Sequence, residues 1–115
     1  MSDCVDRGEY VNIGDALGRL GGNMGLYKML LKRFDGFEYI SEIEESLSSG
    51  DREKAVRAAH SLKGVSANLS FEVLRVLAAD LESLLTNGDD HNECLTKIKD
   101  ALIVTKEKIT EIEAQ

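Results

Sequence analysis

Hydrophobic residues recur at helical spacing, about every three to four positions, along most of this chain. This spacing predicts a short helix over residues 12–20, a helical segment from Met24 to Leu47, a helix over roughly 52–69, a helix from about 71 to 86, and a last helix from about 90 to near the end. The segment from Met24 is either one long helix or two helices joined near Asp35-Gly36. No stretch has the turn-bounded alternation of a β-sheet.

Polar residues and glycines mark the ends of these segments. The residues that can cap a following helix through a side-chain oxygen are Asn12, Asn23, Asp51 and Ser70. The residues that can end a helix are Gly21-Gly22, Gly50 and Gly88. Short turns between long amphipathic helices favour antiparallel neighbours. The sequence therefore predicts an all-α fold, an antiparallel up-and-down four-helix bundle with a short additional N-terminal helix across one end.

The chain of 115 residues suits one domain, which we expect to span residues 12–115 after a flexible N-terminal arm or linker remnant over residues 1–11. Its 21 acidic and 14 basic residues give a net charge of -7, which does not suggest nucleic-acid binding. The N-terminal residues have neither a basic start nor an apolar core, and no apolar run approaches a membrane span. We therefore expect a cytoplasmic protein, with Cys4 and Cys94 as reduced thiols.

The segment around His60 combines an apolar stripe with an unusual outer face. At roughly 100° per residue, the stripe comprises Ala55, Ala58, Leu62, Val65, Ser66 and Leu69. His60 lies almost opposite that stripe. The residues expected around it are Glu53, Val56, Arg57, Lys63, Gly64 and Ala67. We therefore expect an imidazole that faces solvent among cations and very small side chains.

Gly64 is the most informative of these neighbours. A glycine inside a helix costs about 1 kcal/mol relative to alanine, and this one is too far from a helix end to serve as a cap. Gly64 and Ala67 remove side-chain bulk beside His60, so another protein could approach the ring closely.

An exposed imidazole with nearby positive charge suits a phosphate acceptor. Its neutral nitrogen is nucleophilic near neutral pH, and Lys63, one turn further along, could offset phosphoryl charge. On composition alone, a lone histidine is more often a satisfied core residue or an idle surface residue. The predicted orientation of His60 argues against the first alternative, and Gly64 argues against the second.

These residues resemble a known signature. His60-Ser61-Leu62-Lys63-Gly64, followed by Ser66-Ala67-Asn68-Leu69, is similar to the motif of the histidine-containing phosphotransfer (HPt) domains of bacterial multistep phosphorelays. The resemblance extends to residues 16–23, Tyr27 and Phe34 upstream, and to Leu81-Glu82 downstream. Ser70 departs from the pattern, because glycine is more usual there.

The resemblance implies a phosphocarrier rather than a stand-alone enzyme. His60 would accept a phosphoryl group from the aspartyl phosphate of a response-regulator receiver domain and pass it to another receiver. Lys63 would stabilise the phosphoryl charge. The residues implied to bind or admit the partner are Arg57, Ser61, Gly64, Ala67 and Asn68, with Ser66 as a supporting polar position.

The same resemblance carries expectations about partners and context. The chain would have no cofactor or metal of its own, and a partner receiver would supply Mg²⁺. We expect a monomer without membrane contact, either free-standing or the C-terminal domain of a hybrid sensor histidine kinase. In this family the first helix also contributes to receiver docking, so one or two of Leu17, Leu20, Met24 and Tyr27 could be exposed, although most are expected in the core.

Two other functions remain open from the sequence. The chain could be the phosphoacceptor domain of a chemotaxis-type histidine kinase, which shares the His-x-x-Lys-Gly core, or a helical interaction module without phosphotransfer. The presence of His60, Lys63 and Gly64 together argues against the last. A metal role for His91 is disfavoured because no second ligand lies at a suitable spacing. The glycines lack the context of a nucleotide-binding loop.

Overall fold

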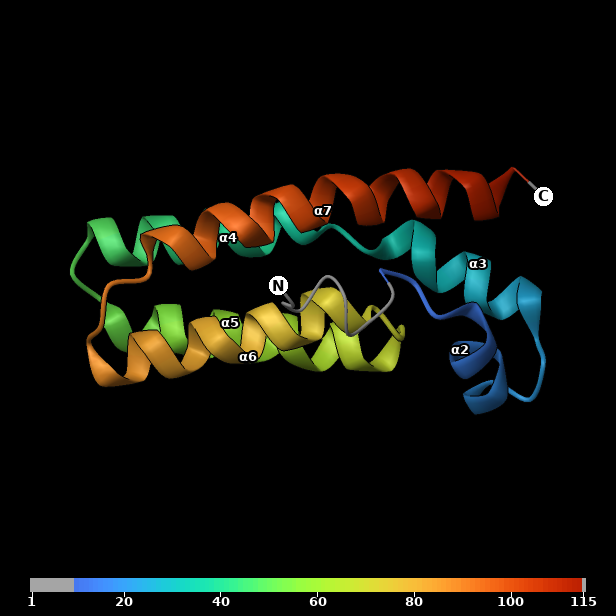
Figure 1. The fold of residues 1–115 in the computed structure, drawn as a ribbon, viewed down its shortest axis with the longest axis horizontal. Helices are drawn as coiled ribbons and strands as arrows, with labels where there is room; N and C mark the ends of the chain where they lie inside the picture. Colours follow the sequence, from blue (N-terminus) through green and yellow to red (C-terminus); the bar gives the residue numbers. More distant parts are fainter. Residues whose placement is uncertain (1–9, 115) are drawn as a thin grey trace, which may run out of the picture.

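The computed structural model describes residues 10–114, which are helical almost throughout (Figure 1). The helices in chain order are α2 (Ile13–Arg19), α3 (Met24–Arg33), α4 (Gly36–Ser48), α5 (Arg52–Asn68), α6 (Glu72–Asn87) and α7 (Asn92–Glu113). No strand occurs within the described range. The prediction of an all-α fold is therefore confirmed.

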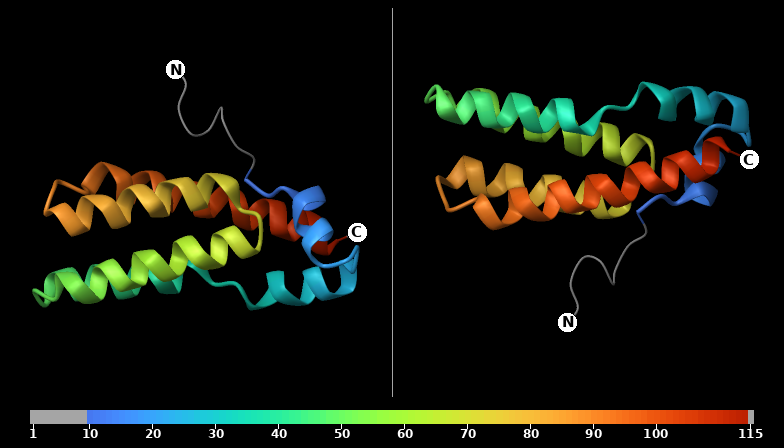
Figure 2. Two further views of the ribbon diagram at one scale, coloured as in Figure 1. Left: turned by 90° about the horizontal axis from the view of Figure 1, so that it is seen from below. Right: turned by 90° about the horizontal axis from the view of Figure 1, so that it is seen from above.

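The longer helices α4 to α7 lie lengthwise beside one another (Figures 1 and 2). The links from α4 to α5 and from α6 to α7 lie at one end, and the turn from α5 to α6 lies at the other, near α2 and α3 (Figure 1). The most extensive packing joins α5 to α6, followed by α4 to α5 and α6 to α7. Helix α5 is thus held between two neighbours, with one side left for solvent.

A single hydrophobic core runs between the helices. Its largest fully buried aliphatic side chains are Leu31, Ile43, Leu62, Leu74, Leu81, Leu85, Ile98 and Leu102. Burial of each such side chain contributes roughly 1.5–3 kcal/mol relative to exposure. This core fixes the rotation of α5 about its axis and hence the direction of its outer face.

The predicted N-caps of α2, α3 and α5 are confirmed. The Oδ1 atoms of Asn12, Asn23 and Asp51 each accept a hydrogen bond from a backbone N–H three residues later, at 3.1, 3.0 and 3.1 Å. Of the two alternatives for the segment from Met24, the structure has two helices. Phe34 is extended and Asp35 caps α4, so the helix is interrupted between α3 and α4.

The prediction that Ser70 caps the helix after it was wrong. The N-cap of α6 is Phe71, which makes no side-chain capping bond. Ser70 instead has a φ of 61°, in the left-handed region that favours glycine, and its Oγ donates to Asp15 Oδ2 at 2.7 Å. The left-handed backbone explains why glycine would fit this turn.

The start of the chain is described only in part. Of the predicted arm over residues 1–11, residues 1–9, including Cys4, lie outside the described range, whereas Tyr10 and Val11 are partly buried against the core. Within residues 10–114, none of the helices combines the length and apolar character needed to cross a membrane.

Two glycines in helices should respond to alanine in opposite directions. Gly36 is buried, and a Cβ added there would overlap Leu102 Cδ2 and lie 2.9 Å from Phe34 Cζ, so we expect Gly36→Ala to destabilise the protein by about 1–3 kcal/mol. A Cβ at Gly64 would meet nothing within 4 Å, so Gly64→Ala should stabilise it by about 1 kcal/mol. Urea denaturation measures both free energies of unfolding, and effects of the same sign would contradict the packing described.

Candidate functional site

His60 lies on the outer face of α5, with 65% of its side chain exposed. On the opposite side of the helix, the buried residues of the predicted stripe are Ala55, Ala58, Leu62, Ser66 and Leu69, and Val65 is half-buried. Ala59, which the predicted stripe did not include, is also buried. The packing of α5 thus leaves the imidazole outside while burying the residue next to it.

The nearest partner of His60 comes from the neighbouring helix α6. The Nδ1 atom of His60 lies 3.0 Å from Glu82 Oε2, and Lys63 Nζ lies 2.8 Å from Glu82 Oε1. One carboxylate therefore bridges the histidine and the lysine, which are a turn apart on α5. We call His60, Lys63 and Glu82 the bridged triad. The sequence prediction placed only residues of α5 itself around His60 and gave Glu82 no role.

The bridged triad fixes the charge of Glu82 and the tautomer of His60. The hydrogen bond from Lys63 is the main reason that the pKa of Glu82 lies below its usual value of 4.5, and the bond with His60 lowers this pKa further. An ionised carboxylate can only accept hydrogen bonds, so the proton of a neutral ring lies on Nδ1. The lone pair of the ring is then on Nε2.

The remaining predicted site residues on α5 differ in how far they are exposed. Arg57, Ser61, Gly64 and Asn68 are exposed on α5, and Ala67 is half-buried. The open space around Gly64 agrees with the sequence argument that this side of α5 can be approached. Ser66 is a correction to the predicted supporting positions, because it is fully buried with the apolar stripe, and within residues 10–114 its Oγ has no hydrogen-bond partner.

The sequence matches a known protein family. Residues 33–114 match the family model described as Hpt domain. The chain belongs to the Hpt domain family. Membership implies histidine phosphotransfer within a phosphorelay and interaction with response-regulator receiver domains. No curated protein and no solved structure matched the chain.

The family match covers α4 to α7 of this Hpt domain but not α2 or most of α3. The residues of this pair that could have joined a docking surface are largely packed inward. Leu17, Leu20 and Met24 are half-buried, and Tyr27 is fully buried with its hydroxyl donating to Leu69 O at 3.1 Å. Burial raises the pKa of Tyr27 to about 12.

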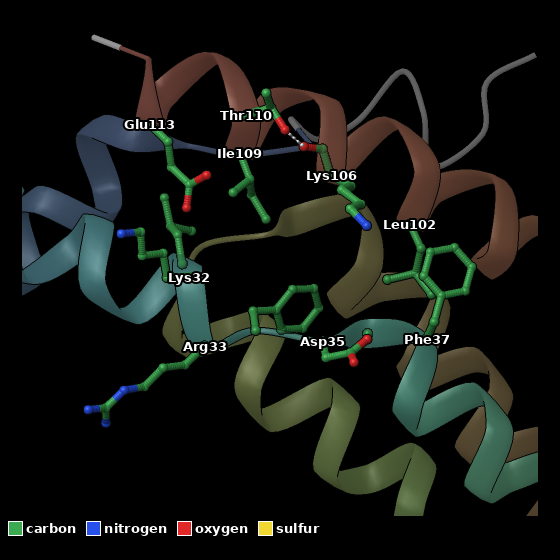
Figure 3. A pocket seen from close by; sticks show the side chains of 12 residues that line it. Lys32, Arg33, Asp35, Phe37, Leu102, Lys106, Ile109, Thr110 and Glu113 are labelled. Atoms are coloured by element: carbon green, nitrogen blue, oxygen red, sulfur yellow. Dashed lines mark hydrogen bonds between the residues drawn. The ribbon is translucent and has the colours of Figure 1, made fainter.

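A separate pocket of about 430 Å³ lies where α3 meets α4 beneath α7 (Figure 3). Leu102 and Ile109 of α7 line it, as do charged side chains of both signs, such as Lys106 and Glu113. None of its lining residues belongs to α5 or α6, so the pocket is separate from the bridged triad. Within residues 10–114, no cluster of His, Cys, Asp or Glu could hold a metal ion.

The ion pair between Glu82 and Lys63 should contribute to stability in a pH-dependent way. Because the pKa of Glu82 is lower in the folded than in the unfolded state, its contribution is present above the unfolded pKa and is lost as the pH falls through the folded pKa. We therefore expect Glu82→Gln to destabilise the Hpt domain at pH 7, with a difference from wild type that shrinks below about pH 4.5.

Urea denaturation across this pH range measures the difference. Glu93→Gln is a matched control, because Glu93 is 87% exposed and lies 3.8 Å from Lys97, and a pair of this kind contributes little. A difference for Glu82→Gln that stays constant from neutral to acid pH would contradict the described role of the carboxylate.

Proposed function

We propose that His60 is the phosphoacceptor of this Hpt domain, receiving a phosphoryl group from an aspartyl phosphate on one receiver domain and passing it to an aspartate on another. The observation that carries this proposal is the exposed imidazole whose Nδ1 is bonded to Glu82. With Nδ1 occupied, Nε2 is the nitrogen that can attack phosphorus.

In the transfer step, the lone pair of Nε2 forms the N–P bond while the bond between phosphorus and the aspartyl oxygen breaks. The aspartate leaves as a carboxylate, and the ring becomes an imidazolium that keeps its proton on Nδ1. Glu82, ionised and 3.0 Å away, stabilises this positive charge. The same proton makes the ring a better leaving group when the phosphoryl group moves to the next aspartate. Transfer is thus reversible at His60.

Lys63 neutralises charge on either side of this step. Before transfer its ammonium pairs with Glu82, and Lys63 itself lies about one helical turn from His60 along α5. Because an ammonium has three N–H donors, Lys63 can keep its bond to Glu82 while donating to a phosphoryl oxygen. Lys63 would then offset the negative charge that the phosphoryl group brings.

The small side chains beside His60 supply access for the partner. Gly64 and Ala67 would lie under the approaching receiver, with Arg57, Ser61 and Asn68 as polar contacts. In residues 10–114 no cluster of His, Cys, Asp or Glu could hold a metal ion. In the proposed function the domain acts as a phosphocarrier, and the receiver would bring Mg²⁺ and the acidic residues that hold it.

The wider setting is proposed with the function. The helices α4 to α7 would form an antiparallel up-and-down four-helix bundle, and residues 12–115 would be the functional domain. It would act as a cytoplasmic monomer, either free-standing or at the C-terminal end of a hybrid sensor histidine kinase. These proposals rest on the helix packing, on the family and on the sequence analysis above.

The phosphoacceptor assignment predicts that label depends on His60. After incubation with a receiver domain phosphorylated by acetyl phosphate, the wild-type chain should carry acid-labile, base-stable phosphate, and His60→Gln should carry none while remaining folded by circular dichroism. The control is His91→Gln, which removes the other histidine of the chain and should label normally. Label in His60→Gln would overturn the assignment.

Access at Gly64 predicts a dependence on side-chain size. Gly64→Gln should lower the efficiency of transfer from a phosphorylated receiver by about tenfold or more, because bulk at a close contact costs at least about 1.4 kcal/mol of binding free energy. Gly64→Ala adds one carbon and should transfer at close to the wild-type rate. Equal rates for all three proteins in a quenched-flow assay would refute the access argument.

A further inference from the structure

The C-terminal end of α5 is held by polar groups from the N-terminal helical pair. The oxygens of Ala67, Leu69 and Ser70 accept hydrogen bonds from Arg19 Nη1 at 2.9 Å, Tyr27 Oη at 3.1 Å and Asn12 N at 2.9 Å. Carbonyls at the end of a helix lack partners further along it, and these three bonds supply partners there, although Ala67 O also accepts from Ser70 N at 3.2 Å. Figures 1 and 2 show α2 and α3 at this end of the molecule.

Side-chain contacts strengthen the same junction. Asp15 Oδ2 accepts from Ser70 Oγ at 2.7 Å and lies 3.4 Å from Arg19 Nη2. Arg19 therefore joins α2 internally, through Asp15, and also reaches α5, through the Ala67 carbonyl. We call the contacts of Asn12, Asp15, Arg19 and Tyr27 with residues 67–70 the N-terminal clasp.

The end of α5 has local features that make such a clasp useful. Gly64 weakens the helix. Ser70, two residues after the end of α5, has a left-handed backbone, which costs energy for a residue with a side chain. Ala67 and Asn68 of the proposed receiver contact lie in this last turn. His60 lies further back, roughly 14 Å along the axis from Leu69, beside the buried Ala59 and Leu62. Core packing therefore holds His60, and the clasp holds the surface beyond it.

We propose that the N-terminal clasp is a positioning element for phosphotransfer, with Arg19 as its central positioning residue. The four N-terminal residues of the clasp lie outside the part of the chain that matches the family model, residues 33–114, whereas residues 67–70 lie inside it. It fixes the last turn of α5 so that Gly64, Ala67 and Asn68 present one ordered surface to the receiver. This inference rests on the proposed function of His60 but assigns the clasp to docking and not to the chemistry at the ring.

The test compares Arg19→Ala, Arg19→Lys and the wild-type 115-residue chain. For each, the rate of phosphoryl transfer from a phosphorylated receiver is measured against Hpt concentration, and amide hydrogen exchange is measured over residues 66–71. We expect Arg19→Ala to raise the half-saturating concentration about fivefold or more at an unchanged maximal rate, with faster exchange in this turn. Arg19→Lys, which can still donate to the Ala67 carbonyl, should lie between the two.

The control is Lys108→Ala, which removes one positive charge from an exposed position on α7 and should change neither quantity. Unchanged half-saturation and exchange in Arg19→Ala would overturn the inference, as would a fall in maximal rate alone. Wild-type values in Arg19→Lys, combined with unchanged exchange in Arg19→Ala, would indicate that only the charge matters and would also overturn it. Failure of the proposed function is read separately, as absence of label on His60 in the wild-type chain.

Discussion

The site depends on one interaction, the contact of the Glu82 carboxylate on α6 with both His60 and Lys63 on α5. This contact requires the two helices to lie close together. The buried side of α5 is built largely from alanines, Ala55, Ala58 and Ala59, and small side chains permit close approach of neighbouring helices. The same packing that forms the core therefore brings a carboxylate from α6 to the edge of the imidazole on the outside.

The two sides of α5 have different roles: one stabilises the fold, and the other leaves His60 open to a partner. The inner side of α5 is anchored by the core, and its outer side carries the bridged triad and the open surface at Gly64. A glycine that weakens the helix is tolerable because both neighbouring helices pack along α5 and because the clasp bonds the carbonyls at its end. The core thus sets the direction in which the proposed phosphoacceptor faces, while Gly64 leaves open space on the same side of α5.

Much of the fold could be predicted from local sequence. Caps such as Asn12, Asn23 and Asp51 bond to amides three residues away. The start of each of these helices can therefore be predicted from a few neighbouring residues. The break before Gly36 was only one of two alternatives, because the close approach of Leu102 to this glycine is a contact between distant segments. Ser70 was misread as a cap for the same reason, since its partner, Asp15, lies 55 residues earlier.

In the candidate site, too, local features could be predicted and contacts between distant segments could not. The outward direction of His60 followed from the helical period, because every residue that decides it lies within about three turns along the same segment. The role of Glu82 could not be obtained in that way, since it depends on how α5 and α6 are aligned along their lengths. The available signal was the position of Glu82 beside the buried Leu81 on the next helix, which placed it near the α5 interface without naming its partner. The hydrogen bond between Arg19 and the Ala67 carbonyl could not be predicted for the same reason, since the two residues lie 48 positions apart.

The most direct test of this account is nitrogen-15 NMR of the His60 ring in the labelled Hpt domain, before and after phosphorylation by a receiver. We expect the neutral ring at neutral pH to carry its proton on Nδ1, and the N–P bond then to form at Nε2. A neutral ring protonated on Nε2, or a phosphoryl group on Nδ1, would contradict the claim that Glu82 selects the reacting nitrogen.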